Sequence, residues 1–239
     1  MKKIIPFLLL LAAPSIRAAD AHLINVKGPV TVKPAGGASY DARHGDPVYN
    51  YDEIKTGPDA AAHLSFKDGT AVLMKSDSDL TIVKKGNDVV LNVAFGELLV
   101  GLKYKPSADQ KFRVKTPAAA ASLQGTSLWV FIDSSTKNAE FSSLEGPVEV
   151  LAQGKKALWE PGQRGKIPFG QAPEAPSPAD FPAGFLDGFK INGSLEGVAV
   201  AMPAAPAPGS ADKPVSNPVP AAGGPASPLA SSTAPATAP

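Results

Sequence analysis

The sequence predicts an all-β domain, a roll or sandwich of many short strands, followed by a disordered tail rich in alanine and proline. Between residues 23 and 167, short runs of alternating apolar and polar residues recur, which is the pattern of strands with one buried face. Glycine, proline and Asp-Gly pairs separate these runs, as expected where tight turns join the strands. At residues 171–180 and 203–239 proline, alanine, serine and glycine dominate, and such a composition buries too little apolar surface to fold.

The amino terminus has the features of a cleaved signal peptide over residues 1–21. Two lysines precede a largely apolar run at residues 4–13, and Ala19 and Ala21 are small residues of the kind that a signal peptidase recognises. Cleavage after Ala21 fits this pattern, and cleavage after Ala18 or Ala19 is the alternative. The apolar run is too short to cross a hydrocarbon core about 30 Å thick. We therefore expect export to the periplasm, with no membrane span in the mature chain.

The strands are expected in a regular order along the domain. Residues 62–66 alternate apolar and polar side chains, the Asp-Gly pair at 68–69 predicts a hairpin turn, and residues 71–74 return as the partner strand. The alanine-rich residues 118–121 follow a proline and are the one place where we expect a helical turn. The remaining expected strands are residues 30–32, 80–83, 89–93, 112–114, 128–132, 139–141, 148–151 and 156–159.

The pattern Gly-Pro-Val-x-Val occurs twice, at residues 28–32 and 146–150. One interpretation is two independent turn–strand units, because proline is tolerated where a strand begins. The other is an internal repeat, which would place the first and last parts of the domain at equivalent positions in the sheet.

Composition excludes several classes of function. The chain has 23 basic and 22 acidic side chains, whereas a protein built to bind nucleic acid usually has a basic surplus. It has no cysteine, which excludes disulfides, thiol catalysis and iron–sulfur chemistry. Its histidines, His22, His44 and His63, lack the spacing of a zinc pair and are expected on the surface. We expect no catalytic residue, no metal and no cofactor.

The aromatic residues suggest one candidate binding surface in a loop. Tyr49 and Tyr51 share one face of a loop-like segment that ends at Asp52. A tyrosine ring with a polar tip suits a binding surface, so these three residues are predicted to contact a partner. Trp129 and Trp159 lie within expected strands and are predicted to pack in the core.

A second candidate surface lies after the expected strands. Phe181, Phe185 and Phe189 recur every four residues and would align on one face of a helix. Either their rings pack back onto the domain, or they form a docking motif for a partner.

Several motifs, taken in order, resemble those of the FecR family. An Asp-x-Ile-x-Thr-Gly turn at residues 52–57 precedes an alternating strand that ends in Asp-Gly at 68–69. A Thr-Pro pair at 116–117 is followed by Gly-Thr at 125–126. The other similar segments are residues 45–48, 78–82, 95–98, 144–150 and 158–163, so the resemblance covers about residues 26–167. The chain departs from the family pattern at Tyr51, Gln124 and Leu128, where a glycine, a basic residue and an aromatic residue are usual.

The resemblance implies a FecR-like β domain at residues 22–170, followed by a linker at 171–202 with the phenylalanine segment and by the tail at 203–239. Well-known members of the family sense iron–siderophore uptake from the inner membrane and control a sigma factor through a cytoplasmic segment. This sequence shows no such segment and no membrane helix before the domain, so the anti-sigma role is not expected.

The leading hypothesis is therefore a non-enzymatic periplasmic scaffold or interaction module that engages an envelope protein. One alternative is an accessory regulator in transmembrane signalling of the iron-uptake type. Another is a module that binds carbohydrate or peptidoglycan of the cell wall. No nucleic acid partner is expected.

Overall fold

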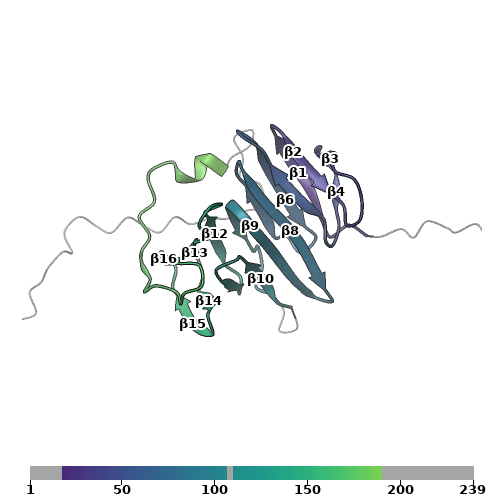
Figure 1. Ribbon diagram of the computed structural model, residues 1–239. Coiled ribbons are helices and arrows are strands. Elements are labelled where there is room, and N and C mark those ends of the chain that lie inside the picture. Colours follow the sequence, from purple (N-terminus) through teal and green to yellow (C-terminus); the bar gives the residue numbers. More distant parts are fainter. Residues whose placement is uncertain (1–17, 107–109, 190–239) are drawn as a thin grey trace, which may run out of the picture. The chain divides into compact units, whose positions relative to one another are not determined.

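The computed structural model describes residues 18–106 and 110–189 and consists almost entirely of β-strands (Figure 1). The prediction of an all-β fold is confirmed. The one helical element in this part of the chain is the short 3₁₀ turn η1 (Phe185–Phe189). Residues 1–17 of the predicted signal peptide, residues 190–202 of the linker and the predicted tail at 203–239 lie outside the described residues.

The strands form two layers that share one long strand, β9 (Asp88–Gly101). In the first layer, sheet A, neighbouring strands pair in the order β4 (Pro47–Val48), β1 (Ala21–Lys27), β6 (Ala61–Phe66), β7 (Ala71–Met74), β9, β12 (Ser127–Ile132), β13 (Ala139–Glu145), β16 (Gln163–Ile167) and β17 (Ser177–Pro178).

In the second layer, sheet B, the order is β3 (Tyr40–Asp41), β2 (Val30–Lys33), β5 (Glu53–Thr56), β8 (Ser78–Lys85), β9, β10 (Phe112–Lys115), β11 (Ala120–Leu123), β14 (Val148–Ala152) and β15 (Lys155–Trp159). All pairs are antiparallel except β9–β10, which is parallel.

The strand β9 changes layer near Gly96. Its first half, from Asp88 to Phe95, pairs with β8 in sheet B, and its second half, from Gly96 to Gly101, pairs with β12 in sheet A. A strand must bend sharply to do this, and Gly96 has a φ of +105°, a conformation essentially restricted to glycine.

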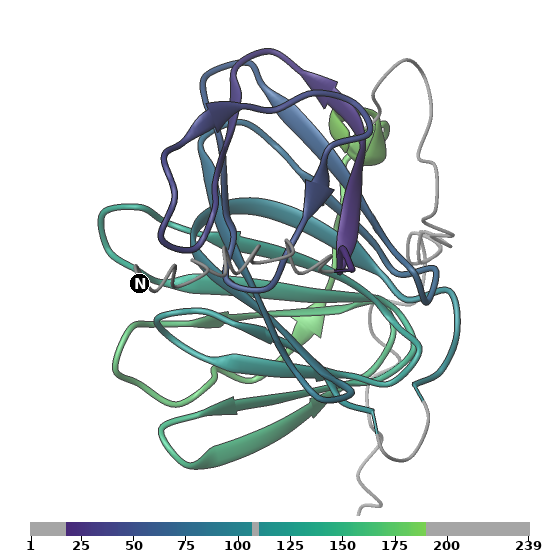
Figure 2. The ribbon, with the colours of Figure 1, turned by 90° about the vertical axis from the view of Figure 1, so that its right-hand side faces the viewer.

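The core lies between the two sheets, because each strand turns alternate side chains inward. On β6 the side chains of Leu64 and Phe66 are buried in the core, as the sequence pattern predicts. Trp159 is fully buried at the β15 end of the same core. Figure 2 shows the strands of the carboxy-terminal half, in green, continuing the layers begun by the purple and blue strands.

Two local predictions have opposite outcomes. The Asp-Gly pair at 68–69 does join β6 to β7 as a hairpin. The helical turn expected at residues 118–121 is wrong, because Ala120 and Ala121 begin β11 and pair with both β10 and β14. Two ladders of backbone hydrogen bonds outweigh the weak helix preference of two alanines.

Both copies of the Gly-Pro-Val-x-Val pattern turn the chain from sheet A into sheet B. The first joins β1 to β2 and the second joins β13 to β14. Gly28 and Gly146 have φ values of +70° and +71°, so each corner contains a glycine in the left-handed conformation. Both copies of the pattern therefore form the same kind of connection from sheet A to sheet B.

The contacts at the start of β1 indicate which of the predicted signal-peptidase cleavage sites leaves the fold intact. Ala21 is fully buried in β1, and the carboxylate of Asp20 accepts a hydrogen bond from the Asn50 N–H at 2.8 Å and pairs with Lys84 at 3.2 Å. Cleavage after Ala21 would remove both residues from the folded domain.

We predict instead that cleavage follows Ala18 or Ala19, so that the mature chain keeps Asp20 and Ala21. The intact mass of the protein recovered from the periplasm measures this directly. A mass that corresponds to a chain beginning at His22 would contradict the prediction and show that the fold tolerates the loss of Asp20.

Candidate functional site

The loop between β4 and β5 contains the first group of predicted binding residues. The carboxylate of Asp52 accepts hydrogen bonds from the backbone N–H groups of Tyr49 at 2.8 Å and Ala35 at 3.3 Å. Asp52 is 2% exposed, so it holds the loop together from within. Tyr51 is 56% exposed, at a φ of +69°, and is the residue of this group that a partner can reach most easily.

A further tyrosine that the sequence pattern did not indicate lies beside this loop. Tyr40, on β3, is 38% exposed. Its pKa is raised above the usual value, first by partial burial and then by the nearby charges of Asp46 and Asp52. A tyrosine phenol is neutral at physiological pH, and the raised pKa keeps the Tyr40 phenol a hydrogen-bond donor at more alkaline pH as well. The exposed rings of Tyr40 and Tyr51 form an aromatic surface at this end of sheet B, and the buried carboxylate of Asp52 supports the loop beneath it.

The second predicted group packs onto the outer face of sheet A. Phe189 is 1% exposed, and Phe181 and Phe185 are half-buried. The Phe181 and Phe185 ring centroids lie 5.9 and 5.7 Å from that of Trp129 in edge-on contacts. Of the two alternatives left open by the sequence, packing back onto the domain is therefore the arrangement observed. We call residues 181–189 the strap; the apolar residues that it covers are Ala71, Leu73, Leu99, Trp129 and Leu144.

Polar contacts also fix the strap. The Lys75 ammonium lies 4.4 Å from the centroid of the Phe189 ring and 2.7 Å from Oε1 of Glu97. The same Glu97 oxygen accepts a hydrogen bond from Nε1 of Trp129 at 2.9 Å. Figure 2 shows the helical turn of the strap, in light green, beside strands of the amino-terminal half.

The prediction that His63 lies on the surface is wrong. Its side chain is 1% exposed, and its Nε2 lies 2.7 Å from the carbonyl oxygen of Phe189. His63 is on the outer face of sheet A, which would be exposed if the strap did not cover it. Of the other histidines, His22 is exposed as expected, and His44 is exposed with its Nδ1 2.6 Å from the carbonyl oxygen of Ile24.

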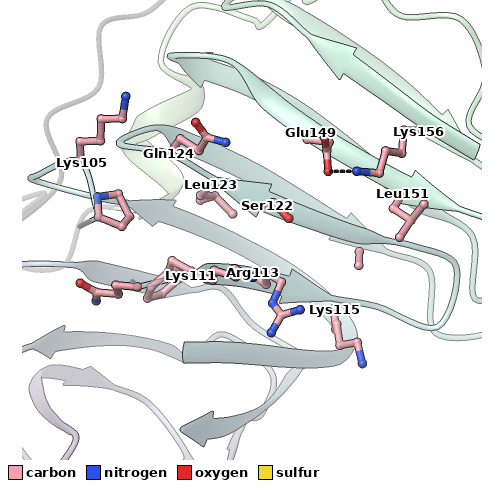
Figure 3. Close-up of a pocket in the computed structure, with 14 residues that line it drawn as sticks. Lys105, Lys111, Arg113, Lys115, Ser122, Leu123, Gln124, Glu149, Leu151 and Lys156 are labelled. Carbon is pink, nitrogen blue, oxygen red and sulfur yellow. Dashed lines mark ion pairs between the residues drawn. The ribbon is translucent and has the colours of Figure 1, made fainter. Parts of the chain in front are cut away.

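The outer face of sheet B holds a groove of about 570 Å³ that sequence reasoning missed (Figure 3). Its floor is β11, where Ala120 and Ser122 have short side chains. One wall is the β10 side, with Lys111, Arg113 and Lys115, and the other is formed by β14 and β15, with Glu149, Leu151 and Lys156. We call this groove the basic trough.

The trough is strongly positive for a chain with balanced charge. Five lining side chains are basic, including Lys105, and Glu149 is the one carboxylate among the lining residues. Glu149 is paired with Lys156 at 3.1 Å, and Arg113 with Asp88 at 3.2 Å. Within the described residues no carboxylate forms an ion pair with Lys111 or Lys115. A trough with unpaired lysines favours an anionic ligand.

A basic row that faces outward can be recognised in the sequence, because basic and apolar residues alternate from Lys111 to Lys115. What the sequence did not indicate is that β10 pairs with β11, whose outward side chains are short, and that β11 pairs in turn with β14. The basic trough depends on these two pairings.

Across residues 18–106 and 110–189, no three histidine or acidic side chains come together in a way that could hold a metal ion. None of the helices in these residues has the length and apolar character needed to cross a membrane.

Comparison with known protein families matches residues 52–149 to the family described as FecR protein. Two solved structures of a protein from Parabacteroides distasonis ATCC 8503, provisionally named an anti-sigma factor, are similar to the chain at 18% identity. Each match has a TM-score of 0.47 and covers 54% of this chain and 60% of the other. No curated protein matches the chain.

Proposed function

Because the chain carries a FecR domain over residues 52–149, we propose that it is a non-enzymatic interaction module of the bacterial envelope that binds a protein partner during signal transmission. The family match is the premise for the signalling role. It spans β5 to the start of β14 and therefore includes β10, β11 and most of the residues around the basic trough.

The observation that carries this proposal is the difference between the two outer faces. The strap covers apolar side chains on the outer face of sheet A. The outer face of sheet B instead exposes Leu151 and Leu158, which are 40% and 60% exposed, next to the basic trough. In the register of β14 with β15 these two leucines are diagonal neighbours. Apolar side chains grouped beside a polar rim are typical of a protein-binding surface.

The trough offers binding groups more than catalytic ones. Its walls present ammonium and guanidinium groups together with the apolar side chain of Leu151, and its floor offers the Ser122 hydroxyl. Such groups orient and neutralise an anionic partner through charge-assisted hydrogen bonds.

Photo-crosslinking in living cells tests the proposal. The photoreactive residue p-benzoyl-phenylalanine replaces Leu158 in one variant and Tyr51 in a second, because the two residues are similarly exposed, at 60% and 56%. We expect the probe at position 158 to capture one dominant envelope protein. A probe at Phe169, which is 57% exposed after β16, is the matched control for random encounters.

The three probes separate the interpretations. Capture from position 51 and not from 158 would move the interface to the tyrosine loop and overturn the assignment to sheet B. Capture of cell-wall polysaccharide in place of a protein, or of nothing above the control at either site, would contradict the proposed function.

A further inference from the structure

We propose that the basic trough binds an extended segment of the partner protein in which acidic and apolar residues alternate, over about five residues. This inference rests on the proposed function and names the chemistry of its partner. The shape of the trough, the spacing of its cations and the apolar character of its second wall all fit such a segment.

The trough has the width of one extended chain. Its floor, β11, pairs with β10 on one side and with β14 on the other. Because neighbouring strands lie about 4.8 Å apart, the two walls are about 10 Å apart. Along one row, Ala120 lies between Lys115 and Leu151, and along the next, Ser122 lies between Arg113 and Glu149. Long side chains thus flank short ones, which leaves room for a peptide backbone.

The cations on the first wall match the repeat of an extended peptide. Lys111, Arg113 and Lys115 occupy alternate positions, so their Cα atoms recur about every 6.7 Å. Carboxylates at alternate positions of an extended segment have the same repeat. Lys111 and Lys115 form no ion pair within the described residues, whereas Lys55, Lys75 and Lys84 each pair with a carboxylate. No carboxylate of the described residues neutralises these two trough lysines, so their ammonium groups can pair with acidic residues of a partner.

The second wall favours apolar side chains. Leu151 is 40% exposed, and its neighbour across the strand is Lys156, whose charge is paired with Glu149. Successive residues of an extended chain point to opposite sides. A segment that lies along β11 with its carboxylates toward β10 therefore turns the intervening side chains toward Leu151. A purely anionic polymer would satisfy the lysines but would leave Leu151 without an apolar contact.

A peptide binding experiment tests this inference with the full chain. The probe is a fluorescein-labelled peptide containing Glu-Leu-Glu-Leu-Glu, and the control peptide has the same composition with the glutamates and leucines in separate blocks. Binding is followed by fluorescence polarisation at low and at physiological salt. We expect the alternating peptide to bind more tightly than the blocked one, with an affinity that falls as salt increases.

Charge reversal locates the binding. The double variant Lys111→Glu with Lys115→Glu should weaken binding of the alternating peptide by about tenfold or more. The matched control reverses the exposed Lys27 and Lys33, on β1 and β2, and should leave the affinity within about twofold. Equal thermal unfolding of the two variants shows that neither change acts through loss of the fold.

Three outcomes would overturn the inference. The first is equal affinity for the two peptides, and the second is an equal loss of affinity in the two double variants. The third is displacement of the alternating and the blocked peptide by heparin fragments to the same extent. If the probe at Leu158 captures a protein partner while the alternating peptide does not bind, the proposed function stands and the occupant assigned to the trough is wrong. If neither experiment detects binding, both proposals fail.

Discussion

Replacing Gly96 by alanine is expected to destabilise the domain by about 3 kcal/mol or more. Gly96 has a φ of +105°, where side chains other than glycine are strained. A Cβ at this position would lie 2.2 Å from Oγ and 2.4 Å from Cα of Ser78. The second of these atoms is backbone and cannot rotate away.

Ser78 is also held from the other side. Its backbone N–H donates to Oγ1 of Thr56 at 3.0 Å, and its Oγ accepts a hydrogen bond from the N–H of Glu97 at 3.0 Å. Moving Ser78 to accept the methyl group would break the contacts that join β5, β8 and β9. The clash therefore disrupts the point where β9 passes from sheet B into sheet A.

Thermal unfolding followed by circular dichroism measures this effect. A loss of about 3 kcal/mol corresponds to a decrease in Tm of about 10 °C for a domain of this size. The matched control is Gly86→Ala in the β8–β9 turn, where φ is +61° and no atom lies within 4 Å of the added Cβ. That variant should lose only about 1 kcal/mol, from backbone strain alone. Equal decreases in the two variants would show that the contact with Ser78 is not the cause.

The β-rich character and many of the strands were predictable because they depend on local patterns. Alternation at residues 62–66 predicted a strand with Leu64 and Phe66 inward, and both are buried. The Asp-Gly pair at 68–69 predicted the turn that follows. These features need only the sequence within a few residues, because the pleat and the turn are set locally.

The features that were missed depend on contacts between distant parts of the chain. Asn92 and Gly96 interrupt the apolar pattern of β9, so the sequence suggested a strand that stopped at residue 93, whereas it continues to Gly101 in the other sheet. Local alternation does not reveal that a strand has partners in two layers. Asp52, which was predicted to contact a partner, is buried, and its carboxylate accepts a hydrogen bond within its own loop.

The basic trough also depends on contacts between distant parts of the chain, which the local sequence pattern does not reveal. The basic row at Lys111, Arg113 and Lys115 was readable as an outward face, but its neighbour across the trough, Leu151, is 36 positions later than Lys115 in the chain. Two strand pairings bring them to the walls of one groove. His63 was assigned to the surface for the corresponding reason, since the strap that buries it returns from residues 181–189.

Replacing Phe189 by alanine is expected to loosen the strap and to expose Trp129. Phe189 is 1% exposed, its ring centroid is 5.8 Å from that of Phe185, and it lies under the Lys75 ammonium at 4.4 Å. Truncating a buried phenylalanine costs about 3 kcal/mol through lost burial and the cavity left behind. The strap packs on an apolar cluster that is separate from the core between the sheets, so much of this loss should appear as local opening rather than as unfolding of both sheets.

Tryptophan fluorescence distinguishes local opening from global unfolding. Trp129 is 8% exposed beneath the strap, whereas Trp159 is fully buried in the core between the sheets. In the Phe189→Ala variant, acrylamide should quench Trp129 more strongly while Trp159 stays protected, and a Trp129→Phe background identifies which residue responds. The matched control is Phe169→Ala, which removes a ring that is already 57% exposed and should change neither quenching nor Tm.

The result decides which face of the domain is available to a partner. If quenching of Trp129 is unchanged in the Phe189→Ala variant, the strap does not depend on this ring. If quenching rises as expected, the strap alone covers the apolar face with Ala71, Leu73 and Leu99, and loss of one ring is enough to uncover that face. Binding of the alternating peptide should then be the same in this variant and in the parent, because the basic trough lies on the opposite sheet and shares no residue with the strap.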